Sequence, residues 1–413
     1  MLTAMQKYLI FFIILFTGSF LGTCGQSQLP GTAIPSATSI KLTLPTATPS
    51  SMPCMVLHAP ATPQAFGADF SSRGHVSGPA DAPVTIVAFS DYQCPACAFL
   101  AASLKQIRLT HPQDVRFVFV NTPLPDHDKD LAATQAVEAA DLQGKFWEMH
   151  DLLYEKQIAW AKLTPAAFES WVAQQAAGLG LDLAKFQSDF TGETVANRIK
   201  LVAQSGTGQS LVPPIFFVNG TSPYSGLADF SSIDTVVRME ALSARQFSDC
   251  PAWIVNPLSQ YIATLHTAKG DVVVQLFPDK APLAVNNFIS LARSGWYDGI
   301  TFYKVIPDFL VMTGDPSETG MGNAGYLFST EISASLPFDQ PGLVAMDNSG
   351  PDTNGSRFLI TLSPAAQLYG QYTVFGKVLS GIEILADLTP RDSKPGMVLP
   401  PGDKLIKVTI QAR

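Results

Sequence analysis

Charged residues are scarce in this chain, and none of them gather into a basic run. Lysine and arginine total 26, and aspartate and glutamate 34, among 413 residues, which gives a formal net charge of −8. An acidic balance supplies no general attraction to nucleic acid or anionic lipid, so we expect no nucleic-acid partner. Hydrophobic residues make up 46% of the chain, which argues against wholesale disorder. The length suffices for two ordinary domains, each with its own core.

Cysteine is also scarce, and the sequence offers few ligands for a metal ion. Among the 5 cysteines, Cys94 and Cys97 form a Cys-x-x-Cys motif. A structural zinc site normally needs four ligands, yet the chain has neither a second such motif nor a paired histidine motif. A static disulfide at so short a spacing is uncommon. We therefore favour a redox-active pair, with no metal and no cofactor, over an inert disulfide or a metal site.

The N-terminal segment has the order of a secretory signal. Lys7 is followed by an apolar run that extends to Phe20, which is too short for a comfortable membrane span. The run ends in Leu-Gly-Thr-Cys at residues 21–24, which resembles the lipobox of bacterial lipoproteins. That resemblance implies a signal peptide over residues 1–24, a lipid anchor on Cys24 and a location on the extracytoplasmic face of the membrane. Ordinary cleavage and an uncleaved anchor are the alternatives.

Composition then separates a linker from a first domain. Residues 25–63 are rich in Ser, Thr and Pro, which predicts an extended tether; an ordered arm packed on a domain is the alternative. Residues 64–250 alternate β-rich and helix-compatible segments. Strands are expected at 84–89, 115–120 and 215–218, and helical stretches at 130–157 and 165–191. Strand–helix–strand order with a helical block inside predicts an α/β domain.

The Cys-x-x-Cys motif directly follows the first of these strands. Residues 90–97, Ser-Asp-Tyr-Gln-Cys-Pro-Ala-Cys, resemble the active site of DsbA-like proteins, which have a thioredoxin-like fold with a helical insertion. If Cys94 begins a helix, the partial positive charge at the helix N-terminus favours its thiolate. Cys94 would then be the accessible nucleophile that attacks a substrate disulfide, and Cys97 the buried thiol that resolves the mixed disulfide.

The same resemblance assigns a proline and leaves the redox direction open. The family places a cis-proline beside the cysteines and before a strand, and Pro214 matches that position. Many relatives have a buried acid six residues before the first cysteine, where this chain has Ala88, so we expect slower turnover. Ala96 stands in place of a histidine found in strong oxidants of the family, and whether the domain oxidises or reduces its substrates stays open.

The other cysteines are left without a role in this motif. If Cys24 carries a lipid and Cys94 and Cys97 form the redox pair, Cys54 and Cys250 remain. An exported protein works where disulfides persist, so we expect these two residues to form a structural disulfide.

After Pro251 the pattern changes to short β-rich segments separated by Gly, Pro, Asn and Asp, as in a barrel or sandwich. Residues 261–266 and 271–277 are expected to form a hairpin. Residues 282–294 are expected to form a helix, with a proline near its start and a glycine just past its end.

Two segments in this region carry a second family resemblance. Residues 302–315 and 350–360, the latter reading Gly-Pro-Asp-Thr-Asn-Gly-Ser-Arg-Phe-Leu-Ile, resemble the signatures of the cyclophilins, which are peptidyl-prolyl cis/trans isomerases. Over residues 258–413 the resemblance implies a mainly-β, eight-stranded barrel with two capping helices.

The cyclophilin active site is altered at its central positions. Isomerisation needs a donor near the prolyl nitrogen and an apolar pocket for the ring. In the family an arginine supplies that donor and a glutamine holds it, and here these positions are Lys304 and Met312. Lysine keeps the charge but lacks the guanidinium fork, and methionine cannot orient it. The resemblance also assigns substrate binding to Met312 itself and to Phe309, Leu310, Asn348, Arg357, Leu359, Leu368 and Tyr372.

Further departures concern the neighbours of these positions. Asp347 replaces a small residue, Arg357 a glutamine and Leu359 a phenylalanine. We therefore expect a weakened isomerase; a module that holds Pro-containing segments without catalysis is the alternative. Together the two resemblances imply a folding factor that acts on unfolded or partly folded exported proteins, with an unidentified redox partner and a membrane attachment through its lipid.

Overall fold

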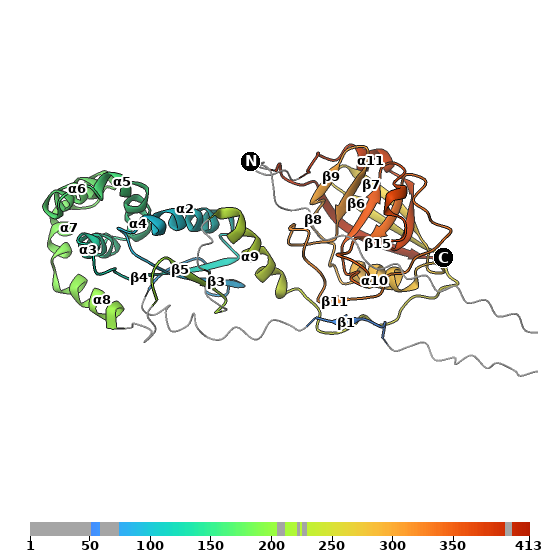
Figure 1. Cartoon of the computed structure of the whole chain (residues 1–413), viewed down its shortest axis with the longest axis horizontal. Coiled ribbons are helices and arrows are strands. Elements are labelled where there is room, and N and C mark those ends of the chain that lie inside the picture. The colour runs from blue at the N-terminus through green and yellow to red at the C-terminus, as the bar shows by residue number, and fades with distance from the viewer. Residues whose placement is uncertain (1–50, 58–73, 205–210, 221–223, 225–228, 393–398) are drawn as a thin grey trace, which may run out of the picture. The chain divides into compact units, whose positions relative to one another are not determined.

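The structure of the chain is a computed structural model. It describes residues 51–57, 74–204, 211–220, 224, 229–392 and 399–413. Cys24, the expected signal peptide and most of the expected tether lie outside these residues. In the described part of the chain, no helix is both long and apolar enough to cross a membrane. Two large sheets organise the described residues (Figure 1).

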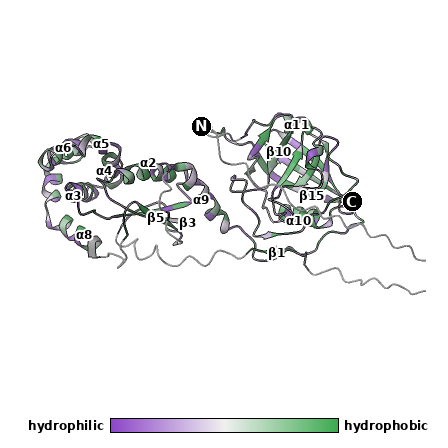
Figure 2. Cartoon of the chain, in the orientation of Figure 1, coloured by the Kyte–Doolittle hydropathy of each residue, from purple (hydrophilic) through white to green (hydrophobic). Residues whose placement is uncertain are grey.

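The first sheet has four strands in the order β2-β4-β3-β5. They are β2 (His75–Ser77), β3 (Val84–Ser90), β4 (Val115–Asn121) and β5 (Ile215–Val218). β3 and β4 are parallel, whereas β2 and β5 pair antiparallel with their neighbours. Alternate residues of β3 enter apolar clusters on opposite faces of the sheet, which explains why a nearly continuous apolar run forms a central strand. Figure 2 shows β5 likewise in hydrophobic colours.

Helices pack on the face of this sheet that carries Val84, Ile86 and Ala88, and those between β4 and β5 form the helical block expected from the sequence. They are α2 (Pro95–Thr110), α3 (Asp130–Asp141), α4 (Phe146–Glu155), α5 (Gln157–Trp160), α6 (Pro165–Gly178), α7 (Leu183–Phe190), α8 (Glu193–Gln204) and α9 (Phe230–Ser243). The two long stretches expected at 130–157 and 165–191 are each divided. Gly144 and Gly180 lie at the divisions with φ values of 72° and 75°, a left-handed conformation that ends helices.

The second sheet is antiparallel and follows the order β8-β15-β6-β7-β14-β12-β13-β10-β9. Its strands are β6 (Tyr261–Thr267), β7 (Gly270–Leu276), β8 (Ile300–Thr301), β9 (Lys304–Ile306), β10 (Leu310–Thr313), β12 (Leu343–Met346), β13 (Phe358–Thr361), β14 (Val374–Ser380) and β15 (Lys404–Ala412). Only Phe302 and Tyr303 separate the two edge strands, β8 and β9, along the chain. The sheet therefore curls until its edges meet, as in a barrel.

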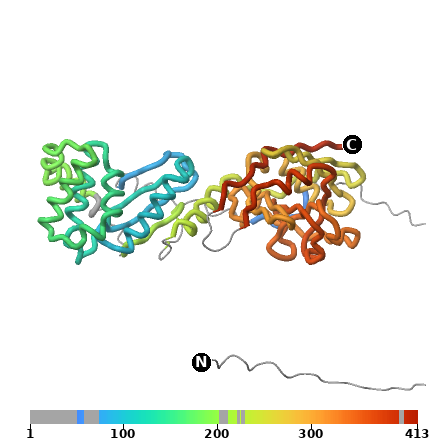
Figure 3. Tube along the Cα trace, turned by 90° about the horizontal axis from the view of Figure 1, so that it is seen from above, coloured from blue at the N-terminus to red at the C-terminus, as the bar shows by residue number. Residues whose placement is uncertain are grey.

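The barrel differs in detail from the eight strands expected. Its sheet contains nine strands in the described residues, of which β8 and β9 are short segments of 2 and 3 residues. Two α-helices accompany it, α10 (Pro282–Arg293) and the shorter α11 (Ile382–Ala386), together with the 3-10 helix η1 (Ala366–Leu368). Figure 3 shows the molecule turned by 90°, and the segments of the barrel, coloured from yellow to red, again lie close together.

Residues 51–57 fall within the expected tether but are ordered on the barrel instead. Strand β1 (Met55–Val56) pairs antiparallel with β11 (Tyr326–Leu327), and Ser51 forms an isolated bridge with Ala252. Met52 is 1% exposed and belongs to the core of the barrel. Backbone pairing and the burial of one large apolar side chain thus fix a segment whose composition alone is typical of a linker.

Cys54 and Cys250 form a disulfide in this region, with a Cα–Cα distance of 5.8 Å. The bond joins the segments on either side of the first domain. Their sequence separation is 196 residues, so the bond closes a very long loop.

Removing this bond is expected to destabilise the protein. On the chain-entropy model, closing so long a loop stabilises the folded state by about 4–5 kcal/mol at most. Denaturant unfolding of the wild type and of a Cys54→Ser/Cys250→Ser variant measures the loss. Non-reducing peptide mapping of the wild type is the control, and free thiols at both positions would contradict the pairing.

Candidate functional sites

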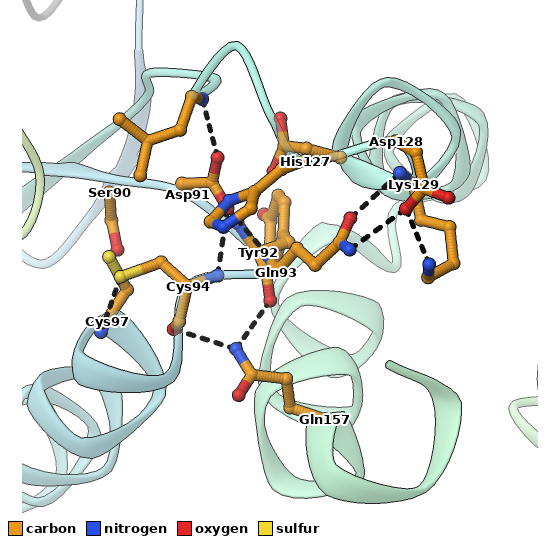
Figure 4. Close-up of polar contacts among 12 residues, drawn as sticks. Ser90, Asp91, Tyr92, Gln93, Cys94, Cys97, His127, Asp128, Lys129 and Gln157 are labelled. Carbon is orange, nitrogen blue, oxygen red and sulfur yellow. Dashed lines mark hydrogen bonds and ion pairs between the residues drawn. The ribbon is translucent and has the colours of Figure 1, made fainter. Parts of the chain in front are cut away.

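Cys94 lies where strand β3 passes into helix α2. The strand ends at Ser90, and α2 begins at Pro95, whose fixed φ suits the first turn of a helix. Cys94 is the N-cap residue, and its sulfur accepts a hydrogen bond of 3.3 Å from the backbone N–H of Cys97. The expected position at a helix N-terminus is therefore the one observed (Figure 4).

The two thiols differ strongly in acidity. A hydrogen bond from the Cys97 side chain and backbone N–H groups of the helix lower the pKa of Cys94 to about 6, against the opposing effect of burial. The same side-chain hydrogen bond and burial raise the pKa of Cys97 well above its ordinary value. Cys94 is 6% exposed and Cys97 0%, so the nucleophile is less accessible than the sequence suggested, although it remains the more exposed of the two.

The low pKa of Cys94 predicts how the reduced protein reacts with alkylating agents. The thiolate is the reactive form, so the alkylation rate of Cys94 is expected to rise with pH to half its plateau near pH 6. Cys97 is expected to stay unmodified across this range. Mass spectrometry after brief iodoacetamide pulses at several pH values measures both rates. A midpoint near that of a free cysteine, at a pH of about 8.5, would contradict the prediction.

A buried carboxylate organises the loop that carries Cys94. Asp91 is 0% exposed, and its Oδ1 accepts the backbone N–H groups of Gln93 at 2.7 Å and Cys94 at 2.9 Å. The ring Nδ1 of His127 lies 2.8 Å from the same oxygen, and the backbone N–H of Leu124 donates to Oδ2 at 2.7 Å. Figure 4 shows these contacts converging on Asp91. Asp91 was not among the residues predicted from the sequence, although an Asp three positions before Cys94 is a known turn-forming signal.

Two further side chains hold the same loop from the helical block. Gln157 is buried on α5, and its Nε2 donates to the carbonyl oxygens of Tyr92 and Cys94, each at 2.8 Å. Asp130 begins α3 and accepts the backbone N–H of Tyr92 at 2.7 Å. Burial, followed by the nearby charge of Asp91, raises the pKa of Asp130 to about 6. The site thus contains two buried acids, at positions other than that of Ala88.

Pro214 lies at the same end of the sheet as Cys94. The Pro213–Pro214 peptide bond is cis, and Ile215, the next residue, pairs with Phe89 across β5 and β3. Because those strands are antiparallel, Pro214 comes level with Ser90, where β3 leads into the Cys94 loop. The structure therefore brings together the three residues that the sequence assigned to this centre.

The other assigned residues lie on the barrel, where side chains alternate between its interior and its outer face. Val305, Val311 and Phe358 enter the interior core. Their neighbours along the chain, Lys304, Met312 and Leu359, face outward. The strand register places Lys304 opposite Met312 and Met312 opposite Leu359. Lys304, Met312 and Leu359 thus form a row across β9, β10 and β13.

An apolar cluster continues this row on the outer face. It comprises Phe338, Leu343, Ala345, Leu359 and Val374, with Met312, Leu336, Leu368 and Tyr372 packed against it. Four of the assigned residues therefore meet in one cluster. Leu310 is buried and Phe309 half-buried at the turn between β9 and β10, outside the cluster. Asn348 is fixed by hydrogen bonds from its Nδ2 to the Gln371 carbonyl at 3.0 Å and to Asn354 Oδ1 at 3.2 Å.

The two cationic side chains near this row are held differently. The Lys304 side chain is 38% exposed, and its closest acidic atom is Asp392 Oδ1 at 3.9 Å. The Arg357 side chain is 10% exposed, with its Nε 3.1 Å from Asp347 Oδ2 and its Nη2 donating to Ser349 Oγ at 3.2 Å. Burial raises the pKa of Asp347, and the charge of Arg357 opposes that rise. Arg357 is therefore held by a close and buried acid, whereas the ion pair of Lys304 with Asp392 is longer and exposed.

In the described residues, no group of three or more His, Cys, Asp or Glu side chains is placed to hold a metal ion.

Comparisons with known proteins separate the same two domains. The family model described as cyclophilin type peptidyl-prolyl cis-trans isomerase/CLD matches residues 262–409, and a thioredoxin model matches residues 71–225. The peptidyl-prolyl cis-trans isomerase CYP18-1 of Arabidopsis thaliana is 41% identical over 152 residues, which cover 36% of this chain and 95% of that protein. Peptidyl-prolyl cis-trans isomerase A of Mycobacterium tuberculosis is 42% identical over 147 residues, covering 32% and 81% respectively.

A solved cyclophilin-type isomerase from Cryptosporidium parvum is 32% identical, covers 38% of this chain and 99% of its own, and has a TM-score of 0.34. On the strength of the curated relatives, the chain belongs to the cyclophilin-type peptidyl-prolyl cis-trans isomerase family through its C-terminal barrel. It also contains a thioredoxin-type domain, which carries Cys94 and Cys97.

Proposed function

We propose that this protein catalyses thiol–disulfide exchange through its thioredoxin-type domain and prolyl cis/trans isomerisation through its cyclophilin barrel. The observation that carries the first activity is the opposed acidity of Cys94 and Cys97 at a helix N-terminus. The second activity rests on family membership and on the apolar cluster of the outer face. Both reactions are slow steps in protein folding.

Thiol–disulfide exchange proceeds in two balanced steps. The Cys94 thiolate attacks one sulfur of a substrate disulfide, which forms a mixed disulfide and releases the other substrate sulfur as a thiolate. Cys97 then attacks the Cys94 sulfur, which leaves an intramolecular disulfide and releases the second substrate thiol. The reverse sequence oxidises a substrate dithiol, so the same residues serve either direction.

Isomerisation requires the peptide C–N bond to lose its double-bond character. The apolar cluster around Leu359 offers a surface for the prolyl ring, and Lys304 offers an N–H donor beside it. Met312, directly opposite Lys304, has no polar group with which to orient that donor. We infer a slow isomerase. The alternative, in which the barrel holds Pro-containing segments without turnover, is favoured by the exposure of Lys304 and by its long, exposed ion pair with Asp392.

The proposed setting is outside the cytoplasm. The Cys54–Cys250 disulfide supports it, because structural disulfides persist in oxidising compartments. Residues 1–24 would then act as the export signal, with Cys24 as the lipid attachment site. The substrates would be unfolded or partly folded exported proteins, and a separate redox protein would regenerate the Cys94–Cys97 pair.

One pair of assays on the full chain tests both activities. Reduction of insulin or oxidation of a reduced peptide reports thiol–disulfide exchange, and Cys94→Ser is its control. A protease-coupled or fluorescence assay on an X-Pro peptide reports isomerisation, and Cys94→Ser should leave that rate unchanged. Absence of any exchange by the wild type would refute the first activity, and an X-Pro rate equal to the uncatalysed one would leave only the binding alternative.

A further inference from the structure

In the second step of the proposed exchange, Cys97 must become a thiolate in order to attack the mixed disulfide. The inference that follows rests on that proposed function. Cys97 is 0% exposed, so solvent cannot stabilise its thiolate. The N-terminus of helix α2 favours the thiolate of Cys94, which is the N-cap residue. Cys97 lies inside the first turn of the helix and is buried. The position at which DsbA-like relatives often have an acid is Ala88, which has no polar side chain. Other groups must therefore support the charge that develops on the Cys97 sulfur.

Two buried hydroxyl groups, those of Ser90 and Tyr154, lie on this side of the site. Ser90, the last residue of β3, is 4% exposed. The Cys94 side chain and burial raise the pKa of Cys97, and the backbone of Asp91 and the side chain of Ser90 oppose that rise. Figure 4 shows the Ser90 hydroxyl directed toward the two sulfurs. On its other side, Ser90 Oγ lies 2.8 Å from the hydroxyl of Tyr154, which is 6% exposed on α4.

We propose that Tyr154 and Ser90 form a donor chain that stabilises the Cys97 thiolate as it attacks the mixed disulfide. The Tyr154 hydroxyl donates to Ser90 Oγ, and the Ser90 hydroxyl donates to the Cys97 sulfur. Donation by the tyrosine polarises the serine hydroxyl and strengthens its bond to the developing charge. Ser90 thus touches the reacting sulfur, and Tyr154 is a positioning residue that acts through it.

The donor chain of Tyr154 and Ser90 stabilises negative charge on the Cys97 sulfur and does not consume a proton. Over the whole step, the Cys97 S–H bond is lost, the Cys94–Cys97 disulfide forms and the bond from Cys94 to the substrate sulfur breaks; the proton passes to the departing thiolate, or to solvent where the departing thiol is acidic. The hydroxyl groups return to their original state. No oxidant is needed beyond the substrate disulfide.

The full chain, with Cys94 and Cys97 reduced and Cys54–Cys250 intact, can be tested with bis(3-carboxy-4-nitrophenyl) disulfide. This reagent releases one coloured thiol when Cys94 attacks and a second when Cys97 resolves the adduct, so stopped-flow absorbance separates the two steps. Ser90→Ala is expected to slow the second release about 10-fold, since a hydrogen bond to a charged group is lost. The first release is expected to change less than about twofold.

Conservative variants distinguish this role from a merely structural one. Tyr154→Phe is expected to slow the second release about 3-fold, and the Ser90→Ala/Tyr154→Phe double variant no more than Ser90→Ala alone, because the tyrosine acts through the serine. Ser90→Thr, which keeps the hydroxyl, should restore most of the rate. Tyr92→Phe is the matched control, since it removes a buried hydroxyl that contacts His150 rather than Ser90.

Several results would overturn the donor chain. Equal slowing of both releases by Ser90→Ala would show a general loss of structure, and an unchanged second release would show that Ser90 does not act on Cys97. Additive losses in the double variant would separate Tyr154 from Ser90. A wild type that releases only one coloured thiol would refute the proposed exchange reaction itself, which is a distinct outcome.

Discussion

A Cys97→Ser variant is expected to accumulate mixed disulfides with its substrates, whereas Cys94→Ser is expected to form none. Cys94 holds the thiolate at neutral pH, because its pKa is lowered to about 6, and it is the more exposed of the two sulfurs. Without Cys97, the adduct on Cys94 has no internal thiol to resolve it. Without Cys94, the remaining thiol is buried and protonated, and reaction with disulfides should fall to the uncatalysed level.

Acid trapping followed by non-reducing electrophoresis measures these adducts. Both variants should keep the Cys54–Cys250 disulfide, so peptide mapping of that bond is a control for correct folding. A Cys54→Ser/Cys250→Ser variant is the matched control for the loss of cysteines outside the site, and it should trap no adduct beyond the level of the wild type. Adducts in Cys94→Ser but not in Cys97→Ser would reverse the assignment of nucleophile and resolver.

Local sequence was sufficient to place the dithiol centre. A β-rich run, a Cys-x-x-Cys motif and a proline at the first helical position specify a strand-to-helix junction, and the structure has Cys94 at the N-cap of α2. A thioredoxin-type and a cyclophilin-type domain were predicted from family motifs, and the family comparisons show that both are present. Both predictions depend on residues that are close together in the sequence or that belong to recognisable family motifs.

The surroundings of the dithiol could not be read from the sequence because they are non-local. Asp91 meets His127 and Leu124 from a loop more than 30 residues away, and Gln157 reaches Cys94 across 63 residues. The ordered segment at 51–57 has the same cause, since Met55 pairs with Leu327 far along the chain. Composition reports what a segment is made of, but it does not report which distant strand edge is available to pair with it.

Restoring the family's donor pair is expected to raise the rate of prolyl isomerisation. In the Lys304→Arg/Met312→Gln variant, a planar guanidinium meets a side chain that can accept its hydrogen bond from directly across the β9–β10 ladder. A donor aimed at the prolyl nitrogen contributes only when it is held in place, and its loss costs roughly 3 kcal/mol, or about 10²-fold in rate. The double variant is therefore expected to approach that gain. Lys304→Arg alone should gain less, because Met312 leaves the new side chain unoriented.

The guanidinium of Arg357 is the competing candidate for the donor to the prolyl nitrogen. Variants that remove Arg357 or Lys304 separately decide between the two. Removing Arg357 alone would leave Asp347 buried without its partner, so the informative variant is Asp347→Ala/Arg357→Gln, which deletes the ion pair as a unit. Lys407→Arg, an exposed substitution of the same kind on β15, controls for a general effect of arginine. If the double deletion leaves the wild-type rate intact while Lys304→Gln lowers it, Lys304 is the donor. If the deletion abolishes isomerisation and Lys304→Gln does not, the donor has moved to Arg357, held by Asp347 in the way that the family's arginine is held by glutamine.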